Sequence, residues 1–103
     1  MTTSPDRYQH TVAFRLRHPS GSDGEAAFLD HARATLSAIP GVEEFVVHRQ
    51  VSAKSELTWQ FSMEFADVEA YRAYDAHPDH IAVVEEHWVS DVDAFQELDF
   101  VRR

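Results

Sequence analysis

The alternation of apolar and polar residues in LTWQFSMEF, from Leu57 to Phe65, is the feature that most limits how this chain can fold. Its leucine, tryptophan, methionine and two phenylalanines recur at every second position, with polar residues between them. A period of two predicts a β-strand with one face in a core and the other in more polar surroundings. The chain therefore needs a sheet, and a second layer packed on its apolar face.

Three more strands are expected. The segment His10–Arg17 alternates in the same way, Val42–Val51 is rich in β-branched and aromatic residues, and Val92–Phe100 is the last strand. The sequence SAKS, residues 52–55, reads as the turn between the second and third strands.

Helices are predicted between these strands. The first begins at the capping-box pair Ser22 and Glu25 and runs to about Ala38, before Pro40-Gly41. The second follows Asp67 as N-cap and stops before Pro78, which disfavours the helical region in the residue before it. A short third helix is expected roughly over residues 78–88, with Pro78 near its first position.

The resulting order, β-α-β-β-α-β, predicts a ferredoxin-like α+β fold with helices on one face of a four-stranded antiparallel sheet. Residues 1–103 are expected to form a single domain, with residues 1–7 as a loose N-terminal arm. Nothing remains in the chain to cover the other face of the sheet. We expect a second copy to cover it in a two-fold homodimer, with an exposed, half-polar sheet as the alternative.

Charge and composition exclude several functions. The formal net charge is −9, with 18 acidic against 9 basic residues, which disfavours nucleic acid and anionic membrane surfaces as partners. The chain has no cysteine, no signal-peptide core and no apolar run that could span a bilayer, so a cytoplasmic location is expected. No glycine-rich phosphate loop is present, so nucleotide chemistry is disfavoured.

The segment YDAHPDHIAVVEEHW, from Tyr74 to Trp88, holds three of the seven histidines and is the candidate site. A neutral His80 could act as a base near neutral pH, and the Tyr74 hydroxyl could donate a hydrogen bond to a developing negative charge. His77 lies next to the helix-breaking proline and could orient the turn. Equally, Tyr74 could be an ordinary core tyrosine, and His80 could cap the short helix.

A pocket is expected in the layer between helices and sheet. His10, Val12 and Phe14 alternate towards that layer, as do Trp59 and Phe61. An apolar cavity with a few converging polar groups is the usual form of a small-molecule site. A metal is not expected, because His77 and His80 with one aspartate supply few ligands and a proline separates them.

These residues resemble a known family. HTVAFRL after a short tail, AIPGV closing the first helix, YDAHPDH and a terminal LDF are similar to the stress-responsive dimeric α/β barrel (Dabb) domains, from about His10 to Phe100. Several members of that family have no established activity. One member type is a cofactor-free plant polyketide cyclase, which closes a linear poly-β-ketoacyl chain by an intramolecular aldol reaction.

The resemblance implies roles for individual residues. The catalytic tyrosine and histidine of the cyclase match Tyr74 and His80, a pocket histidine matches His10, and apolar pocket residues on the first helix match Phe28, Leu29 and Ala32. Two positions depart from the cyclase pattern: a second pocket histidine falls on Trp59, and an apolar position on the last strand falls near Glu97.

The sequence therefore favours a small-molecule-binding dimeric barrel, with a cofactor-independent cyclase of a polyketide-like substrate as the specific hypothesis. In that hypothesis His80 is the base, Tyr74 the oxygen-stabilising donor and His10 a helper. One alternative is a non-catalytic stress-responsive or ligand-binding dimer. Another is a cofactor-free monooxygenase of the antibiotic-biosynthesis type, which shares the dimeric barrel.

Overall fold

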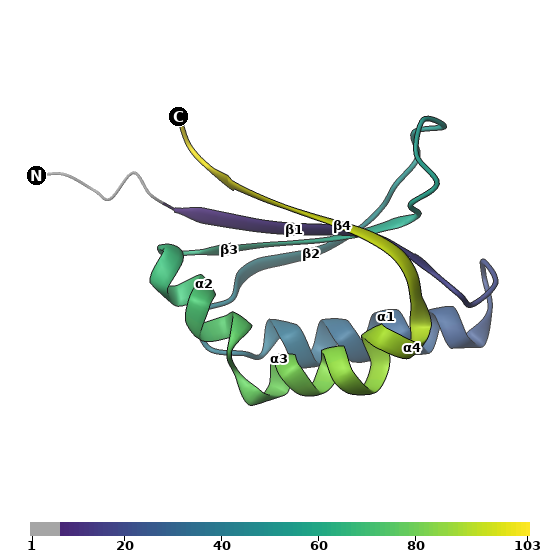
Figure 1. The fold of residues 1–103 in the computed structure, drawn as a ribbon, viewed down its shortest axis with the longest axis horizontal. Helices are drawn as coiled ribbons and strands as arrows, with labels where there is room; N and C mark the ends of the chain where they lie inside the picture. The colour runs from purple at the N-terminus through teal and green to yellow at the C-terminus, as the bar shows by residue number, and fades with distance from the viewer. Residues whose placement is uncertain (1–6) are drawn as a thin grey trace, which may run out of the picture.

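A single antiparallel sheet organises the protein, in a computed structural model that describes residues 7–103. Within that range the strands are β1 (Tyr8–Leu16), β2 (Glu43–Arg49), β3 (Trp59–Phe65) and β4 (Val92–Val101), and their order in the sheet is β2-β3-β1-β4. The first and last strands in the chain are therefore neighbours (Figure 1).

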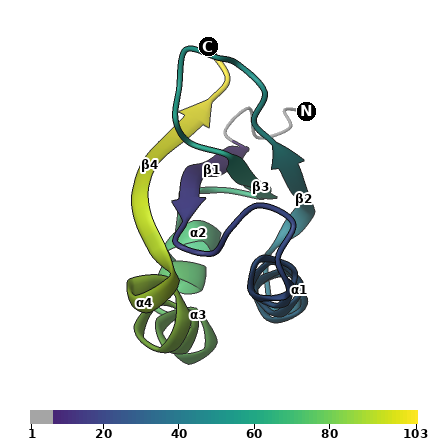
Figure 2. The ribbon, with the colours of Figure 1, turned by 90° about the vertical axis from the view of Figure 1, so that its right-hand side faces the viewer.

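The helices all lie on one face of this sheet (Figures 1 and 2). They are α1 (Asp23–Ser37), α2 (Val68–Asp75) and α3 (Pro78–Val83), which continues through a π-helical turn, η1 (Val84–Trp88), into α4 (Val89–Asp91). The element order and topology confirm the predicted ferredoxin-like α+β fold. None of the described helices is long and apolar enough to cross a bilayer.

Local signals begin the helices where the sequence predicts. The Ser22 hydroxyl accepts a hydrogen bond of 3.2 Å from the Glu25 amide at the start of α1. The Asp67 carboxylate accepts one of 2.8 Å from the Ala70 amide at the start of α2. Pro78 occupies the first turn of α3, where its missing amide proton costs no hydrogen bond.

The core lies between the sheet and the helices. Its largest fully buried side chains come from alternating positions of β1 and β3 and from α2: Phe14, Phe61, Met63, Phe65 and Tyr74. Residues paired across an antiparallel sheet point to the same face, so the register decides which β4 residues face the helices. Val12 pairs with Glu97, and His10 with Asp99. Two carboxylates are thereby placed on the helix side.

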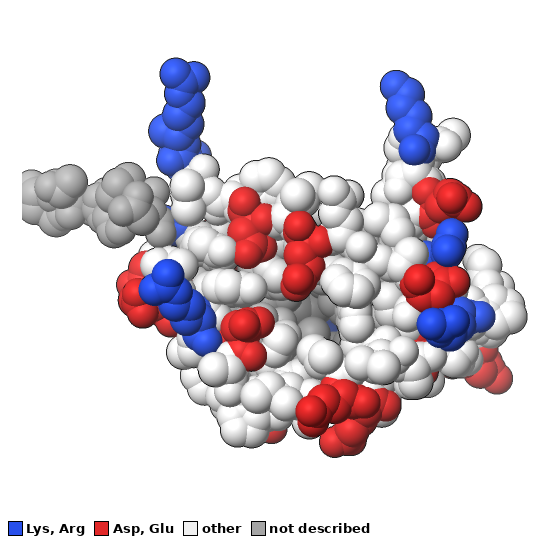
Figure 3. Space-filling model, viewed as in Figure 1, with Lys and Arg blue, Asp and Glu red and all other residues white. Residues whose placement is uncertain are grey.

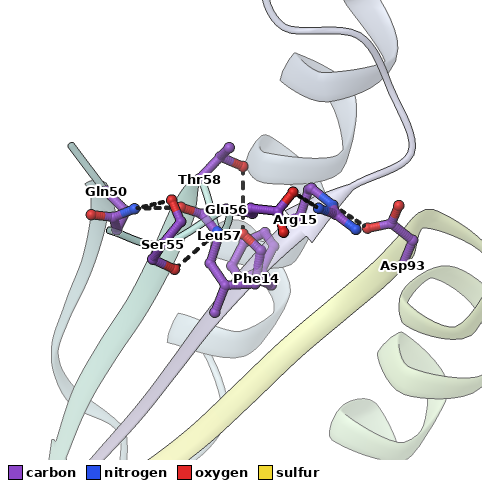
Figure 4. A network of polar contacts seen from close by, with 8 residues as sticks. All are labelled: Phe14, Arg15, Gln50, Ser55, Glu56, Leu57, Thr58 and Asp93. Atoms are coloured by element: carbon purple, nitrogen blue, oxygen red, sulfur yellow. Dashed lines mark hydrogen bonds and ion pairs between the residues drawn. The ribbon is translucent and has the colours of Figure 1, made fainter. Parts of the chain in front are cut away.

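Strands β2 and β3 are shorter than predicted. β2 begins with a register shift between Glu43 and Val46, and Glu44 has a positive φ of 51°. The connection between β2 and β3 is longer than the predicted SAKS turn. The Gln50 side chain donates a 2.6 Å hydrogen bond to the Leu57 carbonyl (Figure 4). The Gln50 amide donates one of 2.8 Å to the Thr58 carbonyl. The first bond lies within the connection, and the second continues the backbone pairing of β2 and β3 one residue beyond Arg49 and Trp59.

The N-terminal end of β1 extends further than predicted. The strand starts at Tyr8, and the Arg7 guanidinium forms ion pairs of 2.7 Å with Glu43 and 3.2 Å with Glu64. The sequence predicts Arg7 in the loose arm, and the structure instead anchors it to the sheet. The remaining residues of that arm, 1–6, lie outside the described part of the chain.

The third helical region is longer and less regular than predicted. It runs to Asp91 instead of Trp88, and the Val89 amide donates to the Val84 carbonyl five residues earlier. Such π-helical turns often occur at functional sites, because they displace side chains from regular helical positions.

Candidate functional site

A cavity of about 240 Å³ lies between the sheet and the α3–η1 segment, and we call it the central cavity. Its apolar lining comes from the sheet (Val12, Phe61, Met63 and Phe95) and from the helices (Leu36, Val83, Val84 and Trp88). Its polar lining consists of Tyr74, Asp75, His80 and Glu97. In the space-filling view, acidic side chains lie around a hollow at the centre of this face (Figure 3). A mainly apolar cavity with a few polar groups suits a small molecule.

Tyr74 lies on the last turn of α2 and is only 1% exposed. Its ring packs on Phe65, with centroids 5.2 Å apart. No residue in the described part of the chain makes a hydrogen bond with its hydroxyl. Every fully enclosed side-chain polar atom in that part has a partner, so the Tyr74 hydroxyl is not fully enclosed and faces the open space of the cavity. Burial, followed by the charges of nearby residues including Asp75 and Glu97, raises the pKa of Tyr74. The hydroxyl therefore stays protonated at neutral pH and can donate a hydrogen bond.

His80 lies beside this tyrosine, with ring centroids 4.7 Å apart. Pro78 ends α2 and starts α3, which turns His80 back against the preceding helix. His80 Nδ1 lies 2.9 Å from the backbone carbonyl of Asp75. Because a carbonyl can only accept, Nδ1 carries the proton and, in the neutral ring, Nε2 has a free lone pair. His80 lines the cavity, and in this tautomer its Nε2 is the ring nitrogen that can accept a proton.

His10 lies behind Tyr74 and not in the cavity lining. It is 4% exposed, and its ring centroid is 6.1 Å from that of Tyr74. His10 Nδ1 is 2.6 Å from an Asp99 carboxylate oxygen, and the Tyr8 hydroxyl donates a 2.6 Å hydrogen bond to the other oxygen. Burial and this hydrogen bond raise the pKa of Tyr8 to about 12. His10 Nε2 lies 3.8 Å from Glu97, which does line the cavity.

The structure brings together four of the residues predicted for the site: Tyr74, His80, Val12 and Phe61. Three others form the adjacent core. Phe14 is fully buried, with its ring 4.7 Å from Phe61 and 5.0 Å from Trp88. Phe28 is buried against Phe14, and Leu29 packs at the edge of the same cluster. None of these three residues lines the cavity, whereas Trp88, whose ring packs near those of Phe14 and Phe28, does.

Trp59 and His77 have other contacts. Trp59 lies at the far end of the sheet, where its indole donates a 3.1 Å hydrogen bond to Glu25 and its ring lies 4.5 Å below the Arg49 guanidinium carbon. His77 is the N-cap of α3, and its Nδ1 accepts a 3.0 Å hydrogen bond from the Asp79 amide. A side chain that caps a helix has one ring nitrogen already engaged.

Eight lining residues are not among those predicted to contact a ligand: Leu36, Met63, Asp75, Val83, Val84, Trp88, Phe95 and Glu97. For Glu97, the family resemblance does predict a pocket position nearby. Phe95 and Glu97 enter through the β1–β4 register, in which they pair with Phe14 and Val12. Trp88 ends the π-helical turn. The alternation of apolar and polar residues in β4 shows which of its residues share a face. Only the pairing register with β1 shows which of the two faces meets the helices. In the sequence, Asp75 is one of two aspartates, with Asp79, that could join His77 and His80 at a metal.

The polar groups do not form a metal centre. Within residues 7–103, no three His, Asp or Glu side chains lie close enough together to bind one ion. What the cavity offers is a proton acceptor at His80 Nε2, a hydrogen-bond donor at the Tyr74 hydroxyl, and two carboxylates. Together these can move a proton within a bound molecule and stabilise charge on its oxygen.

Comparisons with known proteins identify the family to which the chain belongs. The family model described as the stress responsive A/B barrel domain (Dabb) matches residues 8–102. A Dabb family protein with a ferredoxin-like fold from Mesorhizobium loti is 47% identical, over 94% of this chain and 97% of that chain, with a TM-score of 0.93. A search of curated proteins gave no match.

More distant structures share the fold alone. One is a dimeric ferredoxin-like protein of unknown function from Thermobifida fusca, which is 16% identical over 99% of this chain and 96% of that one, with a TM-score of 0.79. Another is SnoaB, a cofactor-independent oxygenase from Streptomyces nogalater, 15% identical over 95% and 94%, with a TM-score of 0.71. With its fold, its helix-side cavity and the family match over nearly its full length, this chain belongs to the stress responsive A/B barrel domain (Dabb) family.

Proposed function

We propose that the central cavity binds a small, largely apolar molecule and that the protein acts on it as a cofactor-independent enzyme, closing a polyketide-like carbon chain by an aldol-type reaction. This proposal is based mainly on one observation. The Tyr74 hydroxyl and the His80 ring meet at the wall of an apolar cavity, one with a free donor and the other with a free acceptor in its neutral form.

The proposed reaction needs only these two groups and a bound substrate. His80 Nε2 removes a proton from a carbon between two carbonyl groups, and the electron pair moves onto the carbonyl oxygen as an enolate. Tyr74 donates a hydrogen bond to that oxygen. The enolate carbon attacks a second carbonyl of the same chain, a carbon–carbon bond forms, and the imidazolium returns its proton to the new alkoxide. No electron acceptor or added proton is required.

The environment supports these roles. The raised pKa of Tyr74 keeps its hydroxyl protonated near neutral pH, so it can donate a hydrogen bond to the enolate oxygen. The bond between His80 Nδ1 and the Asp75 carbonyl holds the ring in one orientation, as a positioned base requires. The similarity in fold to SnoaB shows that this architecture hosts chemistry without a cofactor in at least that protein.

The expected homodimer belongs to the same proposal. On the face of the sheet away from the helices, Leu98 and Phe100 are each 49% exposed and Val46 is 39% exposed. A second copy packed on this face would remove that apolar surface from water. The Leu98→Glu variant should then sediment as a monomer at concentrations where the wild type is a dimer. A wild-type protein that stays monomeric at high concentration would remove the dimer from the proposal.

A turnover assay tests the reaction. The wild type is incubated with a synthetic linear poly-β-ketoacyl thioester, and the cyclised product is measured against the rate without protein. We expect His80→Gln to lower turnover by about 10²–10⁴-fold and Tyr74→Phe by about 10²–10³-fold. The matched control is His31→Gln, because His31 is an exposed residue of α1 that does not line the cavity.

Binding is measured beside turnover to separate an enzyme from a ligand carrier. Retained binding with lost turnover in His80→Gln supports the catalytic roles. Binding by the wild type without turnover of this or related ketides indicates a non-catalytic ligand-binding protein. Unchanged turnover in both variants removes His80 and Tyr74 from the mechanism.

A further inference from the structure

The polar rim of the central cavity is acidic. Asp75 lies at the end of α2 and Glu97 on β4, so two separate elements each contribute a carboxylate to the lining. Their side chains are 58% and 56% exposed, which places both at the mouth and not at the apolar floor. Among the described residues that line the cavity, none is lysine or arginine. The acidic side chains around the hollow are visible in Figure 3.

A second observation points to a ligand at this mouth. Tyr74 is 1% exposed, lines the same cavity, and directs into it a hydroxyl that has no partner among the described residues. Because this hydroxyl faces the open space of the cavity and no side chain or backbone group of the described residues pairs with it, it is available to a molecule bound there. Burial raises the pKa of this hydroxyl, and the nearby charges of Asp75 and Glu97 raise it further.

Two histidines lie near the rim carboxylates, and three carboxylates (Asp75, Glu97 and Asp99) outnumber them. His80 lines the cavity, and its Nδ1 lies 4.0 Å from an Asp75 carboxylate oxygen and 2.9 Å from the Asp75 carbonyl. His10 Nε2 is 3.8 Å from Glu97, but its Nδ1 is held at 2.6 Å by Asp99, whose carboxylate balances any charge on the ring. Arg72, which is close to Tyr8, forms its 2.8 Å ion pair with Glu69. A bound molecule therefore meets a net negative field at the mouth and an apolar surface below it.

We propose that the central cavity selects its ligand by charge, taking ammonium-bearing or neutral small molecules and rejecting carboxylates, with Asp75 and Glu97 as the specificity-determining residues. This inference rests on the proposed function and narrows its substrate class. A polyketide-like chain enters as a neutral ester or thioester, and the corresponding free acid is excluded. A substrate with an amine at one end binds best, with that amine between the two carboxylates.

Three probes of similar size and different charge test the rule: benzylamine, benzyl alcohol and benzoate. Each is titrated into the full-length protein at low ionic strength, and binding is followed by NMR through the amide signals of Tyr74 and His80. An exposed charge pair changes affinity by about two- to fivefold. With two carboxylates we expect the amine to bind about 4- to 25-fold more tightly than the alcohol, and benzoate to bind more weakly than the alcohol. Added salt should reduce both differences.

Variants that remove one carboxylate charge each test whether Asp75 and Glu97 cause the difference in affinity between the amine and the alcohol. Glu97→Gln and Asp75→Asn should each lower the amine-to-alcohol affinity ratio by about two- to fivefold while leaving the affinity for the alcohol unchanged. Glu85→Gln is the matched control, because Glu85 is exposed on η1 and does not line the cavity. It should leave the ratio at the wild-type value.

The outcomes separate this inference from the proposed reaction. Equal binding of all three probes, tighter binding of benzoate, no binding of benzylamine, or an unchanged ratio in both rim variants overturns the charge rule. If the ranking and the variant effects hold while no ketide is turned over, the charge rule stands and the aldol reaction fails. If the ketide is turned over but the three probes do not show the expected ranking, the aldol reaction stands and the charge rule fails.

Discussion

Replacing Tyr74 with phenylalanine tests whether the Tyr74 hydroxyl stabilises the fold or contributes to turnover. The ring stays, so its packing against Phe65 and His80, at centroid distances of 5.2 and 4.7 Å, is retained. The hydroxyl has no protein hydrogen bond within the described residues to lose. A net protein hydrogen bond contributes about 1 kcal/mol, and an unpaired buried hydroxyl costs about 1–3 kcal/mol. We therefore expect the free energy of unfolding to stay within about 1 kcal/mol of the wild type, or to rise, while turnover falls by about 10²–10³-fold.

Tyr8→Phe is the matched control. The same atom is removed, but the Tyr8 hydroxyl donates a 2.6 Å hydrogen bond to Asp99. That bond is partly exposed to solvent, so we expect it to contribute about 1 kcal/mol, which corresponds to a fall in Tm of about 4–8 °C for a domain of this size. Turnover should change little, because Tyr8 does not line the cavity.

Urea denaturation followed by circular dichroism measures stability, and cyclised product from the ketide thioester measures turnover. All samples are compared at one protein concentration, since dimer formation would add to apparent stability. The argument is refuted if Tyr74→Phe loses more than about 2 kcal/mol and keeps its turnover, because the hydroxyl would then have a structural partner.

Three further predictions follow from burial and hydrogen bonding. Phe14→Ala, at a side chain with no exposed surface, should destabilise the fold by about 3–5 kcal/mol in urea denaturation, and a loss below about 1 kcal/mol would contradict its place at the centre of the core. Burial raises the pKa of Tyr8 to about 12 and those of Tyr71 and Tyr74 further above the ordinary value of about 10, so stability is full below pH 10 and falls as pH rises towards and beyond 12. Tyrosinate absorbance should therefore appear together with unfolding in an alkaline titration, and its appearance in the folded protein near pH 10 would show that these rings are accessible. His77→Ala should lose a helix cap at about 1 kcal/mol with turnover retained, and a tenfold loss of turnover would instead make His77 a substrate contact.

Most of the element order could be read from local patterns. The alternation from Trp59 to Phe65 holds in the structure because side chains of a strand point to opposite faces, and only one face meets the helices. The caps at Ser22 and Asp67 work through hydrogen bonds within three residues, so their chemistry is visible in a short stretch of sequence. Pro78 separates α2 from α3 for a similarly local reason.

The candidate site was only partly accessible from the same patterns. The closeness of Tyr74 and His80 follows from a short segment with one helix break, and the family resemblance directed attention to it. The expectation that Phe28, Leu29 and Trp59 would contact a ligand depended on which side chains reach the open space, and packing decides that. Phe28 meets Phe14 and Trp88, and Trp59 meets Glu25 at the far end of the sheet.

The sequence alone determined the α+β class, the six main elements and the segment that carries the tyrosine and histidine, because strand period, helix caps and proline act between near neighbours in the chain. The tertiary structure decided the composition of the cavity. Glu97 reaches the mouth only because β4 pairs with β1 in a register that places it opposite Val12, 85 positions earlier in the chain. A shift of that pairing by one residue would turn Glu97 to the other face of the sheet, and such a long-range choice is made by the packing of the whole core.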